Sequence, residues 1–244
     1  MTGHSRKRQS GLSGNQLKEI AIGAMLLDHI GAFILGYLPI AGTVEKGQVF
    51  ANIYILLRIV GRLAFPIFAF LLTEGFFHTK SVKKYLLRLG TFALLSEIPF
   101  DLALYEKVGD FSMQNVFFTL FIGLFTMYFM EKWEKYLFFC MLVALASSFI
   151  SWFLKTDYGG LGFLLILVFF IFHNRRKEQL AAGAVVMVSM MQRNWEIGYL
   201  ASLPLLYQYN GINKKSEGAK RYAVYLFYPL HLMVLVGIRL LLVS

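Results

Sequence analysis

Apolar residues run through almost the whole chain in long stretches, separated by short polar breaks that carry most of the charges. Most of these stretches approach the length of about 20 residues that an α-helix needs to cross a bilayer. The pattern therefore predicts an all-α protein, a polytopic transmembrane helical bundle of about nine spans. The expected spans are residues 17–38, 51–73, 84–104, 113–130, 136–154, 158–173, 179–192, 195–209 and 222–243.

The beginning of the chain differs from the rest. Residues 1–16, MTGHSRKRQSGLSGNQ, are polar and basic and contain glycine and serine, which predicts a disordered cytoplasmic tail. The apolar stretch that follows has the length of a retained helix and no small-residue cleavage site behind it. Residues 17–244 are joined by short connections only, so we expect a single transmembrane domain.

Lysines and arginines in the connections are divided unequally between the two sides that nine spans would create. Cytoplasmic loops of membrane proteins are enriched in these residues, so the side with the N-terminus is predicted to be cytoplasmic. We expect a multi-pass membrane protein in contact with the lipid bilayer. The cytoplasmic side would hold Arg6, Lys7, Arg8, Lys18, Lys80, Lys83, Lys84, Lys132, Lys135, Arg175, Arg176, Lys177, Lys214, Lys215, Lys220 and Arg221, and the outer side Lys46, Lys107, Lys155 and Arg193.

The composition agrees with a membrane protein. Hydrophobic residues make up 57% of the chain and charged residues 16%, too few to give a soluble domain its polar surface. The net charge of +10 lies in the flanking loops, so it indicates orientation in a membrane and no nucleic-acid partner. The single cysteine, Cys140, excludes an internal disulfide. Glu74 and His78, four residues apart, are too few ligands to predict a metal site.

Polar residues in the middle of apolar stretches are the candidates for chemistry. Asp28 and His29 lie together in "LLDHIGAF", and His231 in "FYPLHLM" is expected at a similar depth in the last span. Histidines at one level of a membrane bundle favour a shared polar site. Consecutive helical residues point about 100° apart. We therefore expect His29 to face a cavity while Asp28 pairs with an arginine or another donor.

Four further charges lie within the second and third spans. "RIVGR" places Arg58 and Arg62 one helical turn apart, and "EIPFD" does the same for Glu97 and Asp101. Because buried charges are costly unless paired, we predict structural ion pairs between these two helices. Pro66 removes a backbone donor after Arg62, so the second span should bend there. Of the two arginines, Arg62 is expected closer to the middle of the membrane, at about the depth of His29.

Amide side chains open the fourth span. Gln114 and Asn115 in "MQNVFFTL" could donate hydrogen bonds to the oxyanion of an acyl-transfer reaction. Asp157 and Tyr158 in "TDYGGLG" and Asn194 and Glu196 in "RNWEIGY" gather at the same outer half, but residues at loop ends are usually only solvated.

Several of these motifs, in order and over about residues 17–235, resemble the TraX family of membrane proteins. The family is known for acetylating the N-terminal amine of conjugative pilin. It is similar to a wider group of transmembrane acyltransferases, which take acetyl groups from cytoplasmic acetyl-CoA and use an intramembrane histidine that His29 matches. The motifs that carry the resemblance are "LKEIAIGAMLLDHIG", "RIVGRLAFPIFAFLLTEGFFHT", "YLLRLGTFALLSEIPFDLA", "QNVFFTLFIGL", "DYGGLGFLLIL" and "LFYPLHLMVL".

The resemblance implies an integral membrane acetyltransferase with acetyl-CoA as its donor substrate. The acceptor would be a protein N-terminus such as that of a pilin, or an exported glycan group. We assign catalytic roles to His29 as base or acyl carrier, with Asp28, Arg62 and His231 beside it. We assign Arg58, Gln114 and Asn115 to the binding of the donor, which would bring its phosphates to the cationic inner loops.

Two other classes of function use the same residues differently. A proton-coupled small-molecule or anion transporter could employ the buried histidines, arginines and carboxylates as a relay. A noncatalytic membrane scaffold would leave these buried charges unexplained. We therefore rank enzyme first, transporter second and scaffold third.

Overall fold

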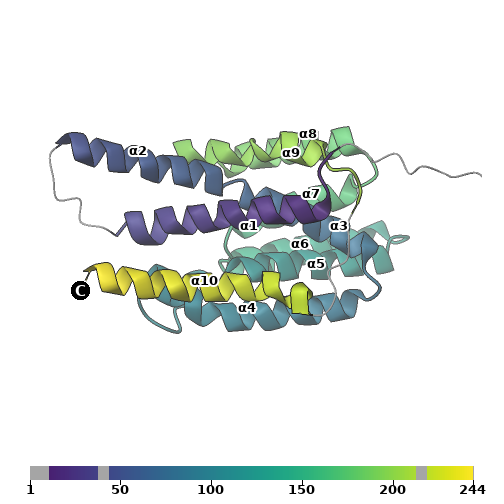
Figure 1. The fold of residues 1–244 in the computed structure, drawn as a ribbon. Helices are drawn as coiled ribbons and strands as arrows, with labels where there is room; N and C mark the ends of the chain where they lie inside the picture. Colours follow the sequence, from purple (N-terminus) through teal and green to yellow (C-terminus); the bar gives the residue numbers. More distant parts are fainter. Residues whose placement is uncertain (1–10, 38–43, 213–218, 244) are drawn as a thin grey trace, which may run out of the picture.

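The computed structural model describes residues 11–37, 44–212 and 219–243 (Figure 1). All regular structure in these ranges is helical, which confirms the all-α part of the predicted fold class. The helices are α1 (Gly14–Ile30), α2 (Val44–Gly61), α3 (Ala64–His78), α4 (Val82–Tyr105), α5 (Val116–Lys132), α6 (Leu137–Phe153), α7 (Gly159–Ile171), α8 (Arg176–Met190), α9 (Ser202–Tyr207) and α10 (Ala219–Val243), with a π-helical turn η1 (Gly31–Leu35) and a 3₁₀-helix η2 (Asn194–Tyr199).

The long helices lie side by side in one bundle (Figure 1). Helix α1 contacts α2, α3 and α10, whereas α4 packs between α5 and α10. Helix α3 forms the centre, where Phe65 and Phe70 are fully buried against residues of α7 such as Phe169. Helix α6 lies outside α5 and α7. The arrangement surrounds α3 with apolar side chains and brings α1 and α10, far apart in sequence, together.

Two predicted spans are interrupted in the structure. The second is divided into α2 and α3 by a turn at Arg62 and Leu63. Pro66 has no N–H to bond the Arg62 carbonyl, and the Leu63 N–H instead bonds the Val60 carbonyl at 3.2 Å. The predicted bend is therefore present, one turn before the proline. The eighth span, 195–209, is divided into η2 and α9.

The start of the first helix also differs from the prediction. Helix α1 begins at Gly14, where Ser13 and Gln16 form a reciprocal capping box. The Leu12 N–H bonds the Gln208 carbonyl at 2.8 Å, so the chain is already ordered before the expected boundary at residue 17. The rest of the predicted tail, residues 1–10, lies outside the described residues.

Two helical stretches within the described residues are long and apolar enough to cross a membrane. One runs through α2 and α3, Gly47–His78, and the other covers most of α10, Tyr222–Leu242. Helices α6 and α7 are apolar but shorter. The structure therefore has membrane-capable helices, while the number and orientation of the spans remain predictions.

Glycines allow the backbone to approach closely around α2. A Cβ atom on Gly198 of η2 would lie 1.9 Å from the Ile59 carbonyl oxygen, and one on Gly61 would lie 2.2 Å from the Asp28 Cβ. Neither position has room for a methyl group. These two contacts hold α2 against η2 on one side and against α1 on the other.

The contact at Gly198 makes the first testable prediction. We expect Gly198→Ala to separate η2 from α2, because the new methyl group meets rigid backbone, and to cost about 1–3 kcal/mol. Gly23→Ala is the control, since a Cβ there meets open space and alanine favours a helix. Thermal unfolding of detergent-purified protein measures both. Equal melting temperatures for the two variants would contradict the close packing.

Candidate functional site

The two histidines from opposite ends of the chain are in direct contact. His29 on α1 and His231 on α10 lie with Nδ1 of the first 2.6 Å from Nε2 of the second. Their ring planes are nearly parallel, at 6°. His231 Nδ1 lies 2.7 Å from the Phe227 carbonyl oxygen, one turn earlier on the same helix. The structure thus brings together the histidines that the sequence places at one depth.

This chain of contacts determines where the protons lie when both rings are neutral. The Phe227 carbonyl can only accept, so His231 Nδ1 carries the proton and His231 Nε2 offers a lone pair. His29 Nδ1 must then donate to it, which leaves His29 Nε2 unprotonated. Within the described residues Nε2 has no hydrogen-bond partner. His29 is therefore oriented as a base, and His231 is the residue that positions it.

Asp28 points away from His29 and pairs with Arg58 of α2 and with Arg62 of the turn that follows α2. Its carboxylate lies 2.8 Å from Arg58 Nη1 and 3.2 Å from Arg62 Nη2. Arg62 also donates to the Tyr199 hydroxyl of η2 at 3.4 Å. The absence of a side chain at Gly61, between the arginines, gives the carboxylate its space. The expected pairing of Asp28 with an arginine is present, and it involves both.

The predicted ion pairs of Arg58 and Arg62 with Glu97 and Asp101 are wrong. The arginines lie on α2, which packs on α1, while both carboxylates lie on α4, which packs on α5 and α10. Glu97 accepts hydrogen bonds from Asn115 instead. Asp101 accepts from the backbone N–H groups of residues 109 and 110, at 2.8 and 3.0 Å. Consecutive helices in the sequence are not neighbours at this point of the bundle.

The two amides at the start of α5 have structural partners. The fully buried Asn115 caps the helix by accepting from the Phe117 N–H at 3.0 Å, and it donates to the Ala93 carbonyl at 2.8 Å. Gln114 connects two loops through its backbone. Its N–H donates to the Lys155 carbonyl at 3.1 Å, and its carbonyl accepts from the Asp157 N–H at 2.7 Å. Neither residue lines the cavities described next.

A small cavity of about 40 Å³ lies beside His29. Asp157 lines it from the loop before α7, and burial raises the pKa of this carboxyl to about 6. Tyr158 and Tyr228 add two phenols, and apolar side chains complete the wall. Arg58 and Arg62 do not line it, because they lie behind Asp28. The motif "DYGGLG" contains Asp157 and Tyr158. Because polar residues at loop ends are usually only solvated, the motif alone does not identify these two as site residues.

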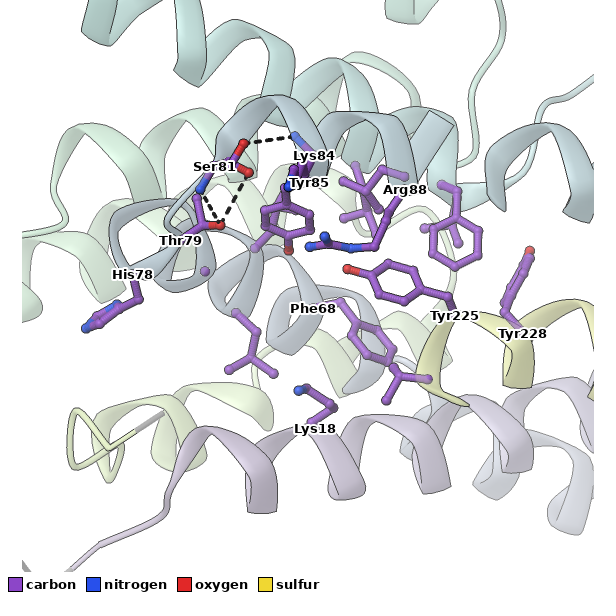
Figure 2. A pocket seen from close by; sticks show the side chains of 18 of the residues that line it. Lys18, Phe68, His78, Thr79, Ser81, Lys84, Tyr85, Arg88, Tyr225 and Tyr228 are labelled. Carbon is purple, nitrogen blue, oxygen red and sulfur yellow. Dashed lines mark hydrogen bonds between the residues drawn. The ribbon is translucent and has the colours of Figure 1, made fainter. Parts of the chain in front are cut away.

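A larger cavity of about 540 Å³ adjoins the small one (Figure 2). Met25, Phe68, Val116 and Tyr228 line both. The larger cavity extends from these residues to the end of the bundle where α1 begins and where α3 passes into α4. Its wall there carries four cations, Lys18, Lys80, Lys84 and Arg88, together with the hydroxyls of Thr79 and Ser81.

Arg88 is held in this wall between aromatic rings. Its guanidinium carbon lies 5.3 Å from the Tyr85 ring centroid and 5.9 Å from that of Tyr225. Figure 2 shows the Arg88 side chain near both rings. The cavity therefore has a cationic mouth and an apolar interior, and its inner end adjoins the small cavity that His29 lines. This shape fits an elongated anionic molecule with a small uncharged reacting group.

The shared carboxylate makes a second prediction. We expect Asp28→Asn to destabilise the protein by about 3–5 kcal/mol, because two largely buried guanidinium groups lose the one carboxylate that lies within 4 Å of them among the described residues. Adding Arg58→Met should recover part of the loss. Glu97→Gln is the control, since its partner is a neutral amide. Thermal unfolding and monodisperse yield measure the effect, and equal losses in Asp28→Asn and Glu97→Gln would contradict it.

The chain is similar to known proteins over nearly its whole length. The family model described as TraX protein matches residues 13–239. The probable fimbrial assembly protein FimC, serogroup H1, of Dichelobacter nodosus is 31% identical over 263 residues, covering 96% of this chain and 99% of that protein. No solved structure matches the chain significantly. The resemblance seen in the motifs is confirmed, and the chain belongs to the TraX family.

Proposed function

We propose that this protein is an integral membrane acetyltransferase that moves an acetyl group from acetyl-CoA to an acceptor amine or hydroxyl. One observation carries the proposal. A large cavity with a cationic mouth and an apolar interior adjoins a small cavity that is lined by His29, a histidine positioned by His231. Coenzyme A thioesters have the matching order of parts: phosphates, an uncharged arm and a reactive carbonyl.

The mouth of the large cavity is the donor-binding region in this proposal. Lys84 and Arg88, one turn apart on α4, would bind the phosphates of the donor, with Lys18 opposite them on α1. The pantetheine arm would contact the apolar side chains that line the interior of the large cavity, which include Phe68, Leu71, Leu72, Leu89, Phe117 and Leu120. These residues replace Arg58, Gln114 and Asn115 as the preferred candidates for donor binding, because the latter do not line the cavity.

The chemistry follows from the orientation of His29. Its Nε2 accepts a proton from the acceptor as the acceptor attacks the thioester carbonyl. The carbon–sulfur bond breaks, and His29 returns the proton to the departing thiolate. His231 holds the ring in the required tautomer through Nδ1. The Tyr228 hydroxyl, which lines both cavities, is placed to donate to the carbonyl oxygen as it becomes negative.

The comparisons support a role at the cell envelope. The TraX family is known for pilin acetylation, and the relative from Dichelobacter nodosus is named as a fimbrial assembly protein. We infer that the acceptor is an exported protein N-terminus such as that of a pilin subunit, or else an envelope glycan group.

The surface of the bundle supports a multi-pass position in the bacterial inner membrane. Large apolar side chains are exposed along several helices, including Leu137 and Phe138 of α6 and Leu87 and Leu94 of α4. Exposed apolar area on this scale needs lipid or another partner. The cationic mouth lies at the start of α1, so an N-terminus in the cytoplasm would open it to cytoplasmic acetyl-CoA.

Replacement of the base is the central test of this proposal. We expect His29→Gln to keep the folded yield and to lower acetyl transfer about 100-fold or more, because an amide cannot shuttle the proton. His173→Gln, a histidine outside both cavities, is the control. The assay follows labelled acetyl from acetyl-CoA onto an envelope extract. Near-normal turnover in His29→Gln would refute the base role, and solute uptake without a covalent product would favour a transporter.

The donor site makes a separate prediction about KM. The double variant Lys84→Gln, Arg88→Gln should raise KM for acetyl-CoA by about tenfold or more and leave kcat nearly unchanged, since charged hydrogen bonds to phosphate are lost far from the reacting atoms. Lys107→Gln with Lys155→Gln removes two cations that lie outside both cavities. This control should keep the wild-type KM. An unchanged KM in the first variant would contradict the assignment of the mouth.

A further inference from the structure

The small cavity beside His29 differs from the larger one in size. It holds about 40 Å³, whereas the cavity that it adjoins holds about 540 Å³. A single water needs about 10–15 Å³ measured in the same way, so the small cavity has room for only a few heavy atoms. A group that reaches His29 from the large cavity must therefore be small.

Two stacked rings form part of the wall of the small cavity. Phe65 and Tyr158 lie with centroids 3.8 Å apart and planes at 8°, and Phe65 is 2% exposed. Gly162 of α7 lies against both, since a Cβ atom there would be 2.4 Å from the Tyr158 Cβ and 3.0 Å from the Phe65 Cζ. The close approach of α7 therefore limits how far the stacked pair can move toward that helix.

We propose that this wall sets the length of the acyl group, and that the site accepts a two-carbon acyl chain and rejects longer ones. The inference rests on the proposed acyl transfer. During that transfer the acyl carbon leaves the sulfur for the acceptor, and the acceptor's proton passes through His29 to the thiolate. The thioester carbonyl must then lie beside His29, with its sulfur toward the large cavity.

The chain attached to the carbonyl carbon consequently extends into the small cavity. A methyl group fits among Ala64, Phe65 and the backbone-fixed Asp157. An added methylene is directed at the Phe65–Tyr158 pair, whose movement toward α7 is limited by the close approach of Gly162. Phe65 and Ala64, the first two residues of α3 after the turn at Arg62, are therefore the specificity-determining residues.

The experiment compares acetyl-, propionyl- and butyryl-CoA as donors. The probe acceptor is a synthetic peptide with a free N-terminal amine, and release of the CoA thiol is measured. In the wild-type protein kcat/KM should fall about tenfold or more for each added methylene. Phe65→Leu replaces the ring with a smaller side chain. It should raise the ratio of kcat/KM for propionyl-CoA to kcat/KM for acetyl-CoA about tenfold relative to the wild type. Phe76→Leu, buried on the same helix outside both cavities, should keep the wild-type preference.

Ala64→Val tests the same wall in the opposite direction and is independent of the stability of Phe65→Leu. Filling the small cavity should lower kcat for acetyl-CoA about tenfold, while inhibition by free CoA, which has no acyl group, stays unchanged. Equal use of all three donors by the wild type, or an unchanged acetyl kcat in Ala64→Val, would overturn the proposal. Absence of transfer from every donor in the wild type would refute the acetyltransferase function itself.

Discussion

The carboxylate of Asp28 receives guanidinium groups from Arg58 of α2 and from Arg62 of the turn after it, and the geometry of the histidine pair depends on that contact. Because Asp28 and His29 are consecutive, fixing one fixes the rotation of α1 and therefore the direction of the other. Arg62 extends the contact to Tyr199 of η2, so separate segments are joined through one buried charge cluster. His29 is positioned by its neighbour's ion pairs on one side and by His231 on the other.

The break between α2 and α3 serves both halves of the site. Before it, α2 carries the arginines that hold α1, and after it, α3 begins with the residues that line the small cavity. In an uninterrupted helix, either the arginines would point away from Asp28 or the first residues of α3 would point away from the small cavity. The proline four residues beyond Arg62 is therefore a local sequence feature with a consequence for the whole centre of the bundle.

The sequence predicted most helices within a few residues, because long apolar stretches bounded by charges leave little choice. It also predicted the meeting of His29 with His231 and the pairing of Asp28, since buried polar groups at one depth need partners. It failed for Glu97 and Asp101, because helical periodicity says which residues share a face and not which helices are neighbours. Phe65, Tyr158 and Arg88 come from three separate helices and loops, so only the folded arrangement reveals the cavities.

The narrow wall beside His29 has another consequence if the protein spans a bilayer as proposed. A wide passage from the cationic mouth to the opposite side of the membrane would conduct protons and ions along the membrane potential. Beside the stacked pair of Phe65 and Tyr158 the small cavity has room for only a few heavy atoms, so this route holds little water. The residues proposed to limit the acyl group would thus also limit the leakage of ions through the centre of the bundle.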